Sequence, residues 1–332
     1  MDIFSINIES GAPKYKQIVG SIEDAIHNGI LKKGDKLPSL NSIKIKHHLS
    51  RDTVLTAFNE LKARGIIQSV VGKGYYVLTE DIRIKRKIFL LFDELNSFKE
   101  DLYNSFLEKL GDNIQVDIFF HHFNYDVFSK LINDHVGDYS NYIIMPANLK
   151  DTIRIIERLP KDKTYILDQT HEELFEYPSI YQNFEKDIYE GLIDGLSLIR
   201  KYNKIVLFFN TQKQPNGILI GFQLFCSEYS FEYEIVEPLH DRDPNSGELF
   251  IVFDDSGLIR IIKKIKQSHL KIAKDVGIIS YNDSALKEII EDGITAISTN
   301  FNLMGQRLAE MILKNEFAQV ENPNTLIVRN SL

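Results

Sequence analysis

The chain has 332 residues and a mass of 38.4 kDa, which at roughly 100–200 residues per domain predicts two or three domains. Hydrophobic residues make up 43% and charged residues 26% of the chain, ordinary values for a folded protein that exclude a disordered tail protein and a coiled coil. No run of about eighteen apolar residues occurs and the N-terminus lacks signal-peptide features, so a cytoplasmic protein is expected.

Charge is segregated along the sequence. The net formal charge is −8, which by itself suggests no affinity for nucleic acid. Residues 1–87 hold 15 Lys and Arg against 9 Asp and Glu, which leaves 24 against 38 for residues 88–332. A basic head on an acidic body is expected if the head contacts phosphates and the body does not.

Three helices are predicted in the basic head. Apolar residues at a 3–4 spacing predict an amphipathic helix over 15–28. Ser39 can cap a short helix over 40–47, and Ser50 can cap a third helix over 51–64. This pattern predicts a small helical unit.

A short hairpin is predicted after the third helix. Residues 66–71 and 75–78 are typical of two strands around the turn Gly72-Lys73-Gly74. The turn places one cation between two flexible residues.

The head resembles the DNA-binding domain of the GntR family of winged helix-turn-helix regulators over about residues 8–78. The resemblance is carried by Gly-Asp-Lys-Leu-Pro-Ser at 34–39, by Ser-Arg-Asp-Thr-Val at 50–54 and by the glycine-flanked hairpin. It implies a small α+β domain whose third helix enters the major groove of DNA. The family usually has arginine where this chain has Asn41, so the sequence preference is expected to differ.

The DNA contacts are predicted at the start of the second and third helices and on the hairpin. Arg51 and Thr53 lie where a recognition helix presents side chains to base edges, and Lys73 would reach the backbone or minor groove. The alternative is a winged domain that only docks proteins and carries these cations as solvated surface charges. The full set of expected contacts is Ser39, Asn41, Ser50, Arg51, Thr53, Gly72, Lys73 and Gly74.

The acidic body alternates short apolar runs with helical periods, as between 184–201 and at 302–314. This alternation predicts parallel sheets with crossover helices, enough for two similar lobes. The expected strands lie at 88–92, 116–120, 142–145, 164–167, 204–209, 232–236, 249–253 and 276–280.

Polar residues follow six of these apolar runs. In open α/β sheets ligands bind at the carboxyl ends of the strands, and a ring of carboxylates and amides suits a sugar or polyol better than an anion. The alternative for each residue is a helix cap, which is expected of Asp255-Ser256 and Asp283-Ser284. The six residues are Asp93, His121, Asn148, Asp168, Asp254 and Asn282.

The body is similar to the LacI/GalR-type effector domain, which has a two-lobed periplasmic-binding-protein-like fold. The similarity is carried by GIISYND at 277–283, by GITAISTNFNLMGQ at 293–306 and by diffuse matches elsewhere in 88–332. It implies effector contacts at Asp168, Asp254, Asn282 and Phe98. The family's usual aspartate is replaced by Asn282 and its usual arginine by Ile218, although Lys213 and Gln214 in the preceding loop could substitute.

The expected architecture is an α+β winged helix-turn-helix domain at 1–78, a linker at 79–87 and an α/β two-lobed, three-layer αβα domain with parallel sheets at 88–332. This combination predicts a homodimeric transcriptional regulator, a repressor of carbohydrate-utilisation genes, that binds operator DNA and a small sugar-like effector. The linker is expected to transmit the effector signal. The alternative is a cytoplasmic sugar-processing enzyme or a solute-binding protein whose head has another role.

Enzyme and metal chemistry find little support in the sequence. No P-loop, GxGxxG or GxSxG pattern occurs, and the adjacent His121 and His122 of a strand would point to opposite faces and could not chelate one zinc ion. A single cysteine, Cys226, excludes disulfide scaffolds and is expected to be a buried thiol. No metal, cofactor or catalytic residue is therefore expected.

Overall fold

The structure is a computed structural model that describes residues 3, 4, 6, 13–82, 86–237 and 242–332. Parts of two predicted segments, residues 1–2, 5 and 7–12 of the head and 83–85 of the linker, lie outside the described residues. Contacts divide the chain into a first unit and a second unit. The first unit comprises residues 1–92, 110–145 and 151–165, and the second comprises 93–109, 146–150 and 166–332.

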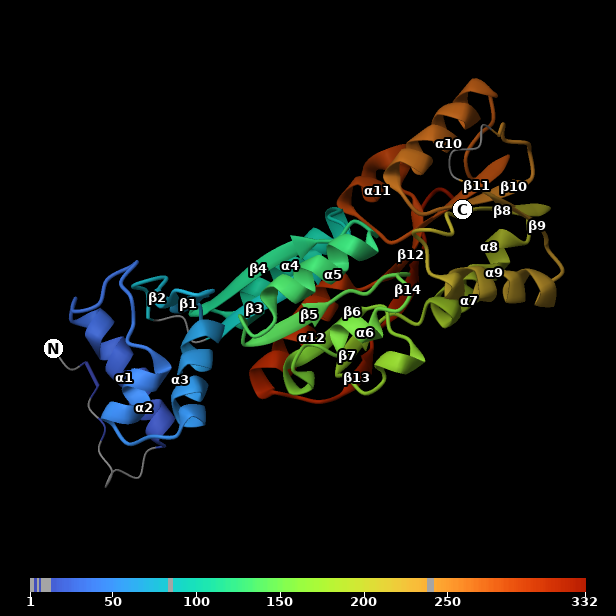
Figure 1. The fold of residues 1–332 in the computed structure, drawn as a ribbon. Coiled ribbons are helices and arrows are strands. Elements are labelled where there is room, and N and C mark those ends of the chain that lie inside the picture. Colours follow the sequence, from blue (N-terminus) through green and yellow to red (C-terminus); the bar gives the residue numbers. More distant parts are fainter. Residues whose placement is uncertain (1–2, 5, 7–12, 83–85, 238–241) are drawn as a thin grey trace. The chain divides into compact units, whose positions relative to one another are not determined.

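The head of the first unit has the three helices and the hairpin expected from the sequence (Figure 1). Its helices pack around a core in which Ile18, Ile22 and Phe58 are fully buried. The observed elements end within a few residues of the predicted limits: α1 Lys14–His27, α2 Leu40–Lys46, α3 Arg51–Ala63, β1 Ile67–Val70 and β2 Gly74–Val77.

Two serine caps define the starts of α2 and α3, as predicted. The Ser39 hydroxyl accepts a hydrogen bond from the Ser42 amide at 3.1 Å, and the Ser50 hydroxyl accepts one from the Thr53 amide at 3.0 Å. Each bond satisfies an amide that has no partner within the helix. These caps fix the point at which each helix begins.

The hairpin is a tight antiparallel wing. Strands β1 and β2 pair from Ile67 with Val77 to Val70 with Gly74. Gly72 and Gly74 have φ values of 71° and 110°, a region that side chains disfavour, so glycine is required on both sides of Lys73. The predicted turn is confirmed.

The remainder of the first unit is a parallel α/β layer. Strand β3 lies between β4 and β5 and pairs in parallel with both. Its fully buried residues run from Ile88 to Phe92, which explains the continuous apolar stretch in the sequence. The elements are β3 Arg86–Phe92, β4 Ile114–Phe120, α5 Tyr125–His135, β5 Asn141–Ile144, α6 Ile153–Ile156 and the 3-10 turn η1 Lys161–Lys163.

The second unit contains a six-stranded sheet with the order β14-β12-β11-β10-β8-β9. All neighbours are parallel except the edge strand β14, which pairs antiparallel with β12. The strands are β8 Lys204–Phe208, β9 Glu232–Val236, β10 Glu248–Val252, β11 Val276–Tyr281, β12 Thr295–Thr299 and β14 Asn324–Ile327.

Separate apolar clusters cover the two faces of this sheet. Helices α7, α8 and α9 contribute to one cluster, and α10 contributes to the other. The expected helix over 184–201 is broken at Gly195 into α7 and α8. The helices of the unit are α4 Ser97–Leu110, α7 Phe184–Asp194, α8 Leu196–Ile199, α9 Asn216–Glu228, α10 Asp255–Gln267, α11 Ala285–Ile289 and α12 Phe301–Lys314, with 3-10 turns η2 Glu172–Leu174 and η3 Ile290–Asp292.

A second set of parallel strands completes the unit. Strand β7 (Ser179–Tyr181) pairs with β6 (Thr164–Asp168) on one side and β13 (Gln319–Glu321) on the other. Every strand predicted from the apolar runs is present, whereas β7, β12, β13 and β14 were not on that list. Cys226 lies buried on α9, as predicted, and burial raises the pKa of its thiol to about 12. Among the described residues no helix is both long and apolar enough to cross a membrane.

Candidate functional site

The head presents the polar start of its third helix to solvent. Arg51 is exposed in the first turn of α3, and Asn41 is exposed in the first turn of α2. The Thr53 hydroxyl lies 2.8 Å from that of Ser50, so these two hydroxyls form a hydrogen bond with each other at the start of the helix. A helix start that projects an arginine suits the major groove, where arginine can bind guanine through two hydrogen bonds.

The wing presents a cation beside an apolar side chain. Lys73 is exposed, and Val71 before it is 97% exposed. Val71 was not among the DNA contacts predicted from the sequence. A valine directly before the glycine-flanked lysine of a turn is the sequence feature that could have identified it.

A cavity lined by amides lies in the second unit and encloses about 620 Å³, part of it open to solvent. Of the eight principal effector residues expected from the sequence, Asn148 lines it, and so does Gln214, which was expected to substitute for the missing arginine. The remaining lining residues are Leu149, Gln169, His171, Phe209, Thr211 and Asn216.

Hydrogen bonds orient the amides of this cavity. The Asn148 side chain donates to the Gln214 carbonyl at 2.6 Å and accepts from the Gln169 side chain at 2.8 Å. The Gln214 side-chain oxygen accepts from the Asn210 amide at 2.6 Å. Three segments far apart in the sequence are thereby held in one polar wall.

The wall of the cavity carries no carboxylate or ammonium group. Burial lowers the pKa of His171, so its imidazole is neutral near pH 7. Amides, a hydroxyl and a neutral imidazole both donate and accept hydrogen bonds, and they pair with hydroxyl groups without the cost of desolvating a charge. This chemistry suits a neutral polyhydroxylated ligand.

Two predicted carboxylates, Asp93 and Asp168, belong to a buried cluster around Lys99. Lys99 forms an ion pair with Asp93, and both side chains are nearly inaccessible. Burial disfavours the Lys99 ammonium, but Asp93 and Asp168 outweigh it and raise the lysine pKa. Burial also raises the pKa of Asp168, whose carboxylate accepts a hydrogen bond from Gln182 at 2.5 Å.

The other predicted effector residues have different surroundings. Phe98 stacks on Phe301 with ring centroids 4.9 Å apart, and Lys213 forms an ion pair with Glu94 at 2.8 Å. His121 is fully buried, with Nε2 3.0 Å from the Met145 carbonyl oxygen. Asn282 has a φ of 61°, and its side-chain oxygen is buried with no hydrogen-bond partner among the described residues.

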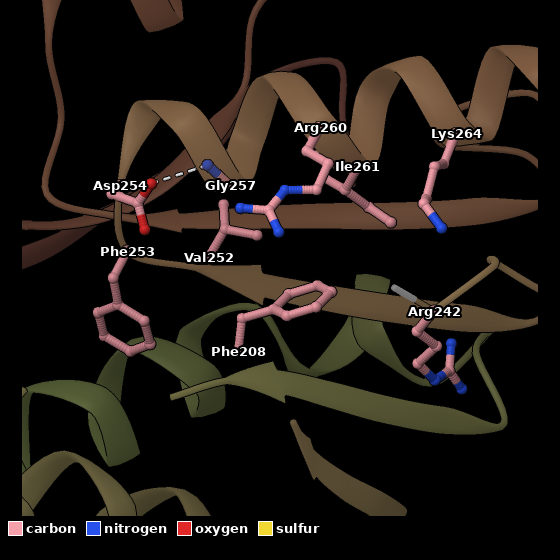
Figure 2. A pocket seen from close by; sticks show the side chains of 9 residues that line it. All are labelled: Phe208, Arg242, Val252, Phe253, Asp254, Gly257, Arg260, Ile261 and Lys264. Carbon is pink, nitrogen blue, oxygen red and sulfur yellow. Dashed lines mark hydrogen bonds between the residues drawn. The ribbon is translucent and has the colours of Figure 1, made fainter. Parts of the chain in front are cut away.

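Asp254 caps a helix. Its Oδ1 accepts a hydrogen bond from the Gly257 amide at 2.8 Å, so the cap of α10 is Asp254 and not the expected Asp255-Ser256. Figure 2 shows Asp254 at one end of a slot between α10 and the sheet, with Phe208 and Val252 on the strand side and Arg260 on the helix side. The space among the lining residues is about 350 Å³, including open solvent. The other cations of the slot, Arg242 and Lys264, already have carboxylate partners.

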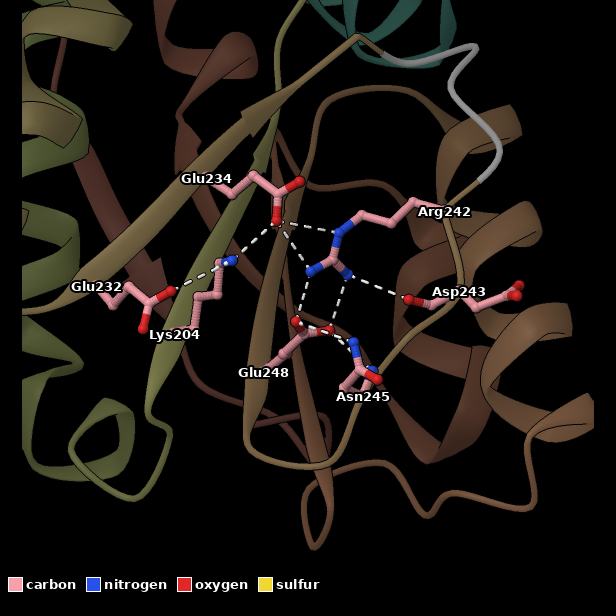
Figure 3. A network of polar contacts seen from close by, with 7 residues as sticks. All are labelled: Lys204, Glu232, Glu234, Arg242, Asp243, Asn245 and Glu248. Atoms are coloured by element: carbon pink, nitrogen blue, oxygen red, sulfur yellow. Dashed lines mark hydrogen bonds and ion pairs between the residues drawn. The ribbon is translucent and has the colours of Figure 1, made fainter.

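A network of ion pairs lies beside this slot, on β8, β9 and β10. In Figure 3 the guanidinium of Arg242 binds Glu234 and Glu248, and Lys204 bridges Glu232 and Glu234. The hydrogen bond to Glu248 and the other contacts raise the pKa of Arg242 above its usual value. This network stabilises the sheet edge formed by β8, β9 and β10 and leaves few charges free to bind a ligand.

A buried carboxyl predicts a pH dependence of stability. Burial raises the pKa of Asp187 to about 7, and one of its oxygens has no partner among the described residues. The native state holds this proton more tightly than the unfolded state does. The contribution of Asp187 to the free energy of unfolding is therefore most favourable below about pH 4 and is lost as the pH rises toward 7. We expect this carboxyl to cost about 2 kcal/mol between pH 5 and pH 7.

Urea unfolding of the wild type and Asp187→Asn at pH 5 and pH 7 measures this cost. The substitution removes the titration, so the variant should lose less stability than the wild type over that interval. Equal losses in both proteins would show that Asp187 is ionised or solvated in the native state.

Two family models match the chain. The model described as "Bacterial regulatory proteins, gntR family" matches residues 14–77, and the one described as "Periplasmic binding protein-like domain" matches residues 198–332. The chain carries a gntR-type helix-turn-helix domain and a periplasmic-binding-protein-like domain. Both resemblances expected from the sequence are confirmed.

Curated relatives with this type of head are transcriptional regulators rather than enzymes. The chain is 35% identical to the HTH-type transcriptional repressor YtrA of Bacillus subtilis over 23% of this chain and 58% of that one. It is 38% identical to the mannosyl-D-glycerate transport/metabolism system repressor MngR of Escherichia coli, over 27% and 35% respectively. It is 26% identical to the regulator CelR of Thermobifida fusca, over 43% and 41%. In each case the chain spans less than two thirds of the relative.

Solved structures share the fold of the body. A LacI family regulator from Enterococcus faecium with bound ribose has 18% identity and a TM-score of 0.60, covering 74% of this chain and 98% of that one. A periplasmic binding protein/LacI regulator from Alkaliphilus metalliredigens complexed with D-xylulofuranose has 15% identity and a TM-score of 0.61, with the same coverage. The expected fold, a winged head followed by two α/β lobes with parallel sheets, is confirmed.

Proposed function

We propose that the chain is a cytoplasmic, homodimeric transcriptional regulator that represses carbohydrate-utilisation genes and responds to a small neutral sugar. The observation that carries this proposal is the gntR-type head with Arg51 exposed at the start of its third helix. The body adds the amide-lined cavity, whose side chains suit a neutral polyhydroxylated ligand. The repressor role is supported by the names of YtrA and MngR.

The head binds operator DNA through the eight residues selected from the sequence, with Arg51 reading a base and Lys73 contacting the backbone or minor groove. The surplus of cations is confined to the region before the body. One head of this modest charge binds weakly, whereas two heads related by a twofold axis would grip half-sites about 34–36 Å apart. Dimerisation is therefore part of the proposal.

The effector is a neutral sugar or a close derivative. The amide cavity lacks charged lining residues, and the two solved relatives described above hold ribose and D-xylulofuranose. The predicted effector residues Asp93, Phe98, His121, Asn148, Asp168, Lys213, Asp254 and Asn282 remain candidates together with Gln214, and from the cavity we add Gln169 and His171.

Fluorescence anisotropy tests the whole proposal. The purified chain is titrated against DNA from upstream of its own and neighbouring genes, with a salt series and a panel of monosaccharides. We expect tight, salt-dependent binding that one neutral sugar weakens. Binding that no sugar alters would overturn the effector class. Turnover of a sugar without operator binding would favour an enzyme.

The cavity assignment predicts the effect of Asn148→Ala. The loss of the two hydrogen bonds that join Asn148 to the Gln169 side chain and to the Gln214 backbone carbonyl should weaken sugar binding at least 10-fold, because each bond contributes about 1 kcal/mol. Operator affinity without sugar should stay within a factor of two. Isothermal titration calorimetry measures the sugar affinity. Asn133→Ala, at an exposed amide on α5, is the matched control, and an unchanged affinity in Asn148→Ala would exclude the cavity as the sugar site.

A further inference from the structure

The end of the recognition helix contacts the sheet of the first unit directly. The ammonium of Lys62, in the last turn of α3, lies 2.7 Å from a carboxylate oxygen of Asp138. The Ser140 hydroxyl donates a hydrogen bond to the Ala63 carbonyl at 3.3 Å. Gly65, just beyond the helix, lies so close to Lys87 that an added Cβ would be 3.0 Å from its Cδ.

Each of these contacts completes the helix end. The last carbonyls of a helix lack partners within it, and Ser140 supplies one to Ala63. Gly65 adopts a φ of 68° and lets the chain reverse, after which the Ile66 amide donates to the Leu61 carbonyl at 2.9 Å. The absence of a side chain at Gly65 also makes room for Lys87. The helix end and the sheet therefore fit each other without a gap.

The surface that receives the helix is itself rigid. Ser140 and Lys87 exchange hydrogen bonds of 2.7 and 3.2 Å between the starts of β5 and β3. The Lys87 ammonium lies 3.0 Å from Asp117 and 4.7 Å from the centre of the Tyr139 ring. Partial burial opposes ionisation of Asp117, yet hydrogen bonds from Gln115, Lys87 and Tyr139 hold its pKa below the ordinary value.

The receiving surface lies at the amino-terminal edge of β3, β4 and β5. The same strands run to the opposite edge, where the His121 amide donates to the Phe92 carbonyl at 3.0 Å and His121 Nε2 approaches the Met145 carbonyl. Parallel strands paired along their length move as one element. A displacement at the carboxyl edge, where ligands bind in this fold class, would therefore reach α3.

We propose that the surface formed by Lys87, Asp138 and Ser140 is the docking site for the end of the recognition helix, and that it couples the head to the effector-binding body. Its partner is the last turn of α3, at Lys62, Ala63 and Gly65. Lys87, the last residue of the predicted linker, lies in β3 and forms part of this surface, so the contact joins the end of the linker to the recognition helix. The expected effect on operator affinity rests on the proposed function, whereas the contact between the helix and the sheet does not.

Hydrogen exchange of the full chain, followed by mass spectrometry, tests the docking contact. We compare the wild type, Lys62→Ala, Asp138→Ala and the charge reversal Lys62→Asp with Asp138→Lys. Exchange in peptides covering residues 61–67 and 138–142 should rise together about threefold in both single variants, as expected for a partly exposed ion pair, and return toward the wild type in the reversal. Lys109→Ala, which breaks the exposed pair with Glu310 in the second unit, is the control and should leave both peptides unchanged.

The outcomes separate this proposal from the proposed function. Unchanged exchange in both single variants, or a charge reversal that exchanges as fast as they do, overturns the docking contact whether or not the chain binds DNA. Where the monosaccharide panel yields an active sugar, that sugar should change the operator affinity of Lys62→Ala at least fivefold less than that of the wild type. A full sugar response in Lys62→Ala would refute the coupling even if the contact exists.

Discussion

Arg51→Ala should weaken operator binding about 100-fold or more while leaving sugar binding unchanged. Arg51 is exposed in the first turn of α3, where a guanidinium can bind a guanine through two hydrogen bonds. One such contact contributes about 1–3 kcal/mol, and a dimer loses it twice. Anisotropy against the operator fragment and against a scrambled duplex of equal length measures the loss and shows that it falls on the specific site.

The control for this experiment is another exposed arginine. Arg154→Ala, on α6 of the first unit, removes the same charge far along the chain from the head. It should change operator affinity by less than a factor of two. A specific affinity in Arg51→Ala equal to that of the wild type would show that α3 does not read DNA, and the proposed function would then fail at its first step.

The head could be predicted almost completely from the sequence because its determinants are local. Ser39 and Ser50 cap helices three residues before the amides that they bind, and Gly72 and Gly74 mark a turn within four residues. The apolar runs of β3 and β10 are buried along most of their length, so hydropathy alone locates them. Helix caps, turn glycines and buried strands depend on residues close in sequence, so they can be predicted without knowledge of the tertiary structure.

The missed elements depend on contacts distant in the sequence. Strands β7 and β13 have only three residues each, too few for a period to appear. Gly195 divides the helix expected over 184–201, and a Cβ there would lie 3.2 Å from the side chain of Leu326. The helical pattern on both sides of Gly195 is intact, and the glycine itself is the one local signal of the break.

The amide cavity shows the same limit. Asn148 was selected because it follows a strand, but its partners Gln214 and Gln169 lie 66 and 21 residues away. Gln214 was named only as a substitute for the missing arginine, whereas a rule that looked at whole loops after strands, such as residues 209–216 with two Gln and two Asn, would have found Asn216 as well. For Asp254 the sequence left two roles open, ligand contact and helix cap. The hydrogen bond from the Gly257 amide shows that it caps α10.

Gly221→Ala should have the largest effect on stability of any variant considered. Gly221 lies on α9 where that helix packs on α7, and a Cβ there would be 2.1 Å from the Glu185 carbonyl oxygen and 2.7 Å from Ile188. A backbone oxygen cannot rotate away, so the helices must separate and expose the apolar cluster between them. Overpacking of this kind costs about 3 kcal/mol or more. Gly20→Ala in α1 is the matched control, since its Cβ meets no atom within 4 Å and alanine favours a helix by about 0.5–1 kcal/mol. Urea unfolding should therefore shift the two variants in opposite directions, and a Gly221→Ala protein as stable as the wild type would show that α7 and α9 do not pack this closely.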